Sequence, residues 1–147
     1  MKVLIVFNHP APYKIRLFNE LASFFDLTVF FERKAATDRT PLFYSNDAIR
    51  FHVEFIPGLY IGKENHFSLS IIRKLKKQTY DLIIMNGYST FTEIATIHYL
   101  QKKKIPYALY VNGGIVRDES KFKFHFKKSL IEKAFLFFSP CAEVDDY

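Results

Sequence analysis

The sequence predicts a doubly wound α/β domain: a mostly parallel sheet between two layers of helices, in one three-layer unit. Six short apolar runs, rich in β-branched and aromatic residues, are each typical of a buried strand. Segments with apolar residues at helical spacing alternate with these runs. Such alternation favours parallel strands joined by right-handed crossovers. The full 147 residues have the length of a single domain.

The predicted strands are short runs that end at polar or turn residues. They cover residues 2–7, 26–31, 50–56, 81–85, 106–111 and 134–139. The first, KVLIVF, is almost continuously apolar, as expected for a strand buried on both faces. The third alternates between polar and apolar residues and ends at a turn formed by Pro57 and Gly58.

Four segments have the apolar spacing of helices: one that begins at Pro12, then 67–77, 89–103 and 119–133. Ser89 or Thr90 is expected to cap the third helix. Residues 32–50 are polar and irregular, so we expect a long loop there. Residues 139–147 look like the start of a further helix, with Pro140 in its first turn. We therefore expect the natural protein to continue beyond Tyr147.

Composition and charge narrow the class of protein. A content of 49% hydrophobic and 24% charged residues is that of a soluble globular domain rather than a disordered chain. No run approaches the ~18 apolar residues of a membrane span. A single cysteine, Cys141, excludes an internal disulfide and fits the reducing cytoplasm that we expect. The net charge of +6 favours anionic partners: nucleic acid, phosphate-bearing ligands or an anionic membrane surface.

The candidate binding site follows from the predicted topology. Open α/β sheets bind ligands beyond the carboxyl ends of their strands, where the strand order reverses. In the order 3-2-1-4-5 this point lies between strands one and four, so loops 8–13 and 86–90 should face each other beside loop 112–114. Their small, polar and aromatic residues suit a hydroxyl-rich ligand. The candidate residues are Asn8, His9, Pro12, Tyr13, Arg16, Asn86, Tyr88, Ser89, Asn112 and Gly113.

Each of these loops also has a purely structural interpretation. The prolines of the first loop could simply stiffen a turn, and Asn86-Gly87 is a good turn dipeptide by itself. Gly113-Gly114 could admit a phosphate or a sugar, or only make a tight turn. No dinucleotide or phosphate-loop glycine motif, metal-spaced histidine pair or nucleophile elbow occurs. The sequence therefore predicts neither a metal site nor particular catalytic residues, and Cys141 is best interpreted as a buried structural cysteine.

The segment 121–128, KFKFHFKK, has two interpretations. Phe122, Phe126 and Leu130 form one apolar row of a helix, and the opposite row is polar, which favours an ordinary solvated face. The alternative is a basic, aromatic patch for an anionic membrane surface. The membrane-facing residues would be Arg117, Lys121, Lys123, Lys127 and Lys128.

Three stretches resemble the N-terminal domain of family-4-like glycosyltransferases of the GT-B type, which build bacterial surface polysaccharides. They are MKVLIVFNHPAPYKIRLFNELASFFDLTVFFER, DLIIMNGYSTFTEIATIHYLQKKKIPYALYVNGG and KKSLIEKAFLFFSPCAEVDDY. The resemblance implies two Rossmann-like domains, of which this chain is the acceptor-side one. It also implies retaining, metal-independent hexosyl transfer from a UDP- or GDP-sugar to a sugar or a lipid-linked glycan. The expected location is the cytoplasm or the inner face of the cell membrane.

Two departures from the family pattern limit what the resemblance carries over. The family's glutamate pair, eight residues apart in the donor-binding domain, does not occur here, so we expect the donor half to be absent from this chain. Many relatives carry a histidine after strand five, where this chain has Asn112. An asparagine can bind a hydroxyl but cannot act as a base. A catalytic role is therefore not carried over to this loop.

Other classes of protein remain as alternatives. A stand-alone α/β binding or regulatory module would have the same fold, although the acidic cluster of a receiver domain is missing after strand one. Nucleic-acid binding is suggested by the charge but by no motif. A GT-B-shaped sugar epimerase would also need the second domain.

Overall fold

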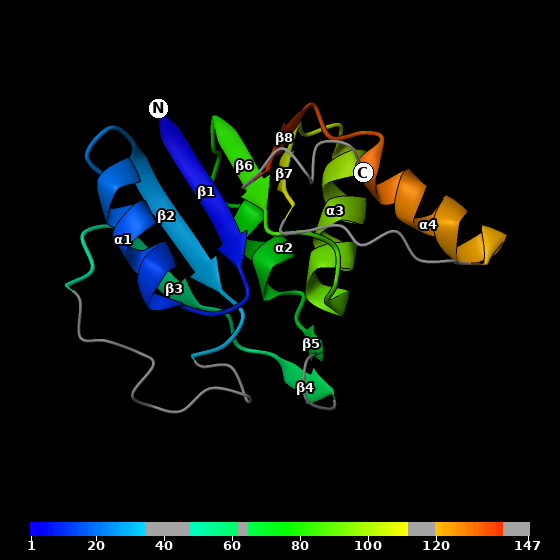
Figure 1. Ribbon diagram of the computed structural model, residues 1–147, viewed down its shortest axis with the longest axis horizontal. Helices are drawn as coiled ribbons and strands as arrows, with labels where there is room; N and C mark the ends of the chain where they lie inside the picture. Colours follow the sequence, from blue (N-terminus) through cyan, green and yellow to red (C-terminus); the bar gives the residue numbers. More distant parts are fainter. Residues whose placement is uncertain (35–47, 62–64, 112–119, 140–147) are drawn as a thin grey trace.

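A computed structural model describes residues 1–34, 48–61, 65–111 and 120–139 and confirms the predicted α/β fold (Figure 1). The main sheet has six strands in the order β3-β2-β1-β6-β7-β8, and all of its pairings are parallel. Its strands are β1 (Lys2–Phe7), β2 (Asp26–Phe31), β3 (His52–Phe55), β6 (Leu82–Met85), β7 (Ala108–Tyr110) and β8 (Leu136–Phe138). Counted along the sheet, this is the predicted order with the sixth strand added beside the fifth.

Helices cover both faces of the sheet. They are α1 (Pro12–Leu21), α2 (Ser70–Leu75), α3 (Phe91–Lys103) and α4 (Lys121–Ile131). Alternate residues of β1 enter two different cores, as the twofold period of a strand requires. Val3, Ile5 and Phe7 pack with residues of α1, whereas Leu4 and Val6 belong to the core on the side of α2 and α3. The predicted three-layer arrangement is thus observed.

Phe18 of α1 is the central aromatic residue of the first core. Its ring centroid lies 5.6 Å from that of Phe7 and 5.8 Å from that of Phe51, both in edge-on geometry. Such pairs add about 0.5–1.5 kcal/mol to the burial of the rings. They hold α1 against the end of β1 and the start of β3.

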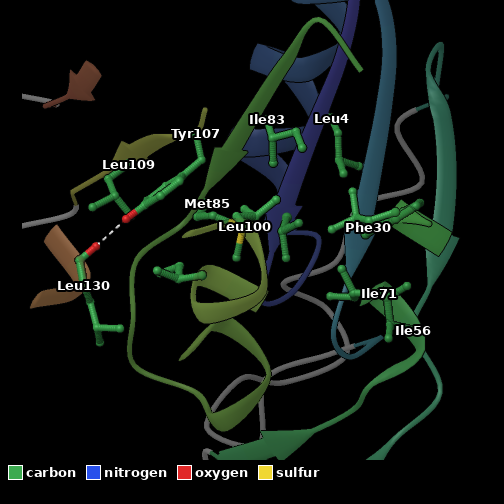
Figure 2. Close-up of a cluster of buried hydrophobic side chains, with 13 residues drawn as sticks. Leu4, Phe30, Ile56, Ile71, Ile83, Met85, Leu100, Tyr107, Leu109 and Leu130 are labelled. Carbon is green, nitrogen blue, oxygen red and sulfur yellow. Dashed lines mark hydrogen bonds between the residues drawn. The ribbon is translucent and has the colours of Figure 1, made fainter. Parts of the chain in front are cut away.

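Tyr107 connects β7 to α4 in the second core (Figure 2). Its hydroxyl group donates to the carbonyl oxygen of Leu130 at 2.7 Å and accepts from Gln101 Nε2 at 2.9 Å. Leu130 is fully buried, but Phe122 at the other end of the predicted apolar row is 84% exposed. The C-terminal half of α4 is therefore anchored, by Leu130 and by the ring of Phe126, whose centroid lies 6.3 Å from that of His98, and the first turns project from the body of the domain (Figure 1).

A two-stranded antiparallel hairpin, β4 (Leu59–Ile61) with β5 (Asn65–Phe67), was not predicted. The helix expected over 67–77 was wrong at its start, because α2 begins only at Ser70. Contacts to distant residues hold the chain out of the helix here. The backbone N–H of Ser68 donates to Thr92 Oγ1 at 2.9 Å, and Ser68 Oγ donates to the carbonyl oxygen of Pro57 at 2.6 Å.

Candidate functional site

The loops that follow β1, β2 and β6 meet at the carboxyl edge of the sheet, where the strand order reverses. The backbone N–H of Asn86 donates to the carbonyl oxygen of Val6 at 3.0 Å, and that of Arg33 donates to the carbonyl oxygen of Asn8 at 2.9 Å. These bonds continue the parallel pairing one residue beyond β6 and two residues beyond β2. The predicted neighbourhood of loops 8–13 and 86–90 is therefore observed.

The loop after β1 presents a mixture of half-buried and exposed side chains. Asn8, His9 and Pro12 are half-buried, whereas Arg16 is exposed and Tyr13 is 64% exposed. Asn8 Oδ1 accepts the backbone N–H of His9 at 3.1 Å. Pro12 begins α1, as predicted, and no side chain caps this helix.

The loop after β6 is shaped by a helix cap. Thr90, rather than Ser89, caps α3: its Oγ1 accepts the N–H of Glu93 at 3.1 Å. Glu93 Oε2 accepts in return the N–H groups of Ser89 (2.7 Å) and Thr90 (3.0 Å). This reciprocal capping box leaves the Ser89 side chain exposed and Asn86 and Tyr88 half-buried. Gly87 has a φ of +126°, a backbone conformation that favours glycine at this position.

The remaining predicted residues lie either outside the described ranges or on α4. Asn112, Gly113 and Arg117 lie outside the described residues, as does Cys141. On α4, Lys121, Lys123 and Lys128 are exposed and Lys127 is half-buried. Figure 1 places α4 on the far side of β7 and β8 from β1. The four lysines thus form a surface separate from the candidate site.

A buried polar cluster that was not predicted lies against this edge. Glu32, the residue after β2, is 1% exposed, and its Oε1 accepts the hydroxyl of Thr90 at 2.8 Å. His66 of β5 lies with its Nδ1 3.8 Å from Glu32 Oε2 and 3.0 Å from Thr92 Oγ1. The Thr92 hydroxyl already donates to the carbonyl oxygen of His66 at 2.8 Å. Its contact with Nδ1 therefore requires that the imidazole be the donor.

Burial controls the protonation of this cluster. Burial, reinforced by the neighbouring Glu93, raises the pKa of Glu32 from 4.5 to about 8. Burial also raises the pKa of Glu93, opposed by the two N–H groups that its carboxylate accepts. Among the described residues Glu32 Oε2 has no hydrogen-bond partner, whereas the Glu93 carboxylate accepts two backbone N–H groups, so we assign the proton to Glu32 and the charge to Glu93. Burial and the charge of Arg33 lower the pKa of His66, which is neutral at pH 7.

A second unpredicted feature is the buried lysine of α1. Lys14 is 3% exposed, and its Nζ donates to Tyr110 Oη at 2.7 Å. Its Nζ also lies 4.0 Å from the ring centroid of Tyr110, at the end of β7. The first turn of α1 is thereby linked to the end of β7, which lies at the same edge of the sheet as the ends of β1 and β6.

Some of these unpredicted residues could have been recognised from the sequence. Lys14 lies four residues before Phe18, on the apolar row of the predicted helix, which is an unusual place for a cation. Thr90 and Glu93 have the spacing of a capping box. Glu32 follows a strand directly. His66 had no local signal, because it depends on a hairpin that the sequence did not predict.

No family model, curated protein or solved structure matches this chain. Within the described ranges, no three His, Cys, Asp or Glu side chains are grouped as metal ligands. No helix in those ranges is long and apolar enough to cross a bilayer.

We predict that Glu32→Gln increases stability more at high pH than at low pH. The folded pKa of about 8 is above the ordinary value of 4.5, so the stability that Glu32 contributes is complete below pH 4.5. It is lost as the pH rises towards 8. Glutamine keeps the shape of the protonated acid and does not ionise. By thermal unfolding, the free energy of unfolding of the variant minus that of the parent should increase by about 1–3 kcal/mol from pH 5 to pH 9.

The matched control is Glu20→Gln, because Glu20 is an exposed carboxylate of α1. The stability of this control should follow that of the parent at every pH. Parallel curves for the parent and Glu32→Gln from pH 5 to 9 would show that Glu32 is ionised in the folded protein, against our assignment.

Proposed function

We propose that this chain is the acceptor-binding half of a glycosyltransferase. The reaction would transfer a hexosyl group from a nucleotide-sugar to a glycan or a lipid-linked acceptor, in the synthesis of a cell-surface polysaccharide. One observation carries the proposal: two segments with polar and aromatic residues, the loop after β1 with the start of α1 and the loop after β6, begin side by side at the point where the strand order reverses. This is the position at which open α/β sheets bind ligands. The side chains are Asn8, His9, Tyr13, Asn86 and Tyr88.

These side chains suit an acceptor better than a nucleotide. Amide, imidazole and phenol groups both donate and accept hydrogen bonds, as sugar hydroxyl groups do. Tyr13, 64% exposed, offers a ring face against which a sugar can pack. A UDP- or GDP-sugar would be held by a second domain, which is this chain's proposed partner, and we expect no metal ion. The role of the loops is to hold and orient the acceptor.

The alternative is a stand-alone α/β binding or regulatory module without catalytic activity. It would use the same edge of the sheet, and the fold supports both functions equally. The two differ in chemistry, because only the first transfers a sugar. Incubation of the product of the complete reading frame with labelled nucleotide-sugars and glycan acceptors separates them.

We predict that the chain binds glycans through Asn86. Saturation-transfer NMR against a panel of oligosaccharides should give binding, and Asn86→Ala should weaken the best ligand by about 5- to 10-fold, the loss of one or two hydrogen bonds. The control is Gln78→Ala, since Gln78 is exposed near the opposite edge of the sheet. Equal affinity of both variants, at unchanged melting temperature, would remove Asn86 from the site.

We further propose that α4 contacts an anionic membrane surface. Phe122 and Phe126 are exposed one turn apart on one face of α4, Phe124 is exposed on another face, and the cations Lys121, Lys123 and Lys128 are exposed along the same helix. An exposed apolar group framed by positive charge is typical of interfacial helices. Because only the last turn of α4 is buried, its first turns can lie on a bilayer without disturbing the core.

The membrane contact predicts a strong effect of charge reversal. Each basic residue near an anionic surface contributes about 1 kcal/mol, so Lys121, Lys123 and Lys128 changed together to Glu should weaken vesicle binding at least ~150-fold. Sedimentation with vesicles containing phosphatidylglycerol, at low salt, measures this. The control makes the same changes at Lys102, Lys103 and Lys104, exposed at the end of α3. An equal loss of vesicle affinity in both triple variants would show that the vesicles attract the positive charge of the protein in general and not α4 in particular.

A further inference from the structure

Lys14 is a buried cation with no counter-ion among the described residues. It is 3% exposed, and within the described part of the chain its ammonium group has no carboxylate partner. It also lies in the first turn of α1, where the helix dipole is positive and no acidic residue is present. Buried charges in proteins are ordinarily paired, because desolvation of an isolated ion is costly. The burial of this ammonium group at the positive end of a helix dipole therefore requires an explanation.

Lys14 and Tyr110 together have more hydrogen-bond donors than the described residues around them have acceptors. An ammonium group has three N–H donors and no acceptor, so Tyr110 Oη must accept the 2.7 Å bond from Lys14 Nζ. The hydroxyl proton of Tyr110 is therefore available, and no acceptor for it lies among the described residues. Aromatic rings flank the cation: the centroids of Tyr13 and Phe7 lie 5.3 and 5.4 Å from Nζ. Rings offset part of the desolvation but neutralise no charge.

These donors lie at the same edge as the candidate site. Phe7 ends β1, Tyr110 ends β7, and Lys14 stands at the start of the helix that follows β1. We propose that Lys14 and Tyr110 form a binding site for the phosphoryl group of a ligand. A phosphoryl group offers several anionic oxygens on one centre, so it can accept from both side chains and neutralise the ammonium charge.

The phosphoryl group has two possible sources: a lipid-linked or glycosyl phosphate on the acceptor side, or the diphosphate of a nucleotide. We assign it to the acceptor, and this assignment rests on the proposed function. The anion site itself does not, because it follows from the burial and the hydrogen bonds of Lys14.

The test is thermal unfolding of the chain and of Lys14→Met in increasing inorganic phosphate, at constant ionic strength. Methionine keeps the unbranched apolar stem and removes the charge. The melting temperature of the parent should rise by roughly 3–6 °C once phosphate reaches about ten times its dissociation constant. Lys14→Met should show no rise. Without phosphate it should melt at or above the parent, because an unpaired buried charge has been removed.

Two further variants keep the test decisive. Lys77→Met removes an exposed lysine and should keep the full phosphate response, which separates the site from the general effect of a positive net charge. Tyr110→Phe removes only the hydroxyl group and should reduce the response, so it decides the matter if Lys14→Met fails to fold. No phosphate response in the parent, or an equal response in Lys14→Met or Tyr110→Phe, would overturn the proposal.

The source of the phosphoryl group is tested by calorimetry with geranyl phosphate and with UDP. Geranyl phosphate bound at least ~10-fold more tightly than UDP, with the difference lost in Lys14→Met, supports the acceptor side. Tighter binding of UDP overturns that assignment and leaves the anion site in place. A phosphate response that depends on Lys14, without any glycan binding, would retain the anion site and contradict the proposed function.

Discussion

The position of β1 is the constraint on which the rest of the structure depends. It is hydrogen-bonded to a parallel strand on each side and covered by side chains on both faces, so nearly all of its residues are buried. A parallel strand in this position must be apolar throughout, and only its ends are available for polar chemistry. The loop after Phe7 and the loop after Met85 are therefore placed side by side. The described candidate residues of these two loops take their positions from this register.

The buried polar cluster attaches further parts of the chain to the same edge. Glu32, His66 and Glu93 come from three segments that are distant in the sequence, and Thr90 contacts both carboxyl groups. A protonated Glu32 removes the repulsion that two buried carboxylates would otherwise have. The hairpin and the start of α3 thus stay packed against the end of β2. This arrangement supports the loop that carries Asn86 and Tyr88 without placing the cluster itself in contact with solvent.

The sequence predicted the strands, their order and the two facing loops because these depend on local apolar patterns and on general rules of parallel sheets. Thr90 was predicted as one of two caps for a similar reason. The hairpin was missed, since its two strands have three residues each and are held by contacts with Thr92. Lys14 and Tyr110 are 96 residues apart, and only the folded sheet shows that one is the partner of the other. Pairings of this kind cannot be obtained from spacing alone.

The central claim is that one edge of the sheet, at the ends of β1, β6 and β7, is the ligand site. Amide chemical-shift mapping with glucose 1-phosphate tests it most directly, because this probe carries both hydroxyl groups and a phosphoryl group. The account predicts that perturbed amides gather at residues 8–16, 86–90 and 110, with little change at the opposite edge, around 23–26 and 78–81. Perturbations confined to α4 or to the opposite edge, or none at millimolar concentration, would contradict it.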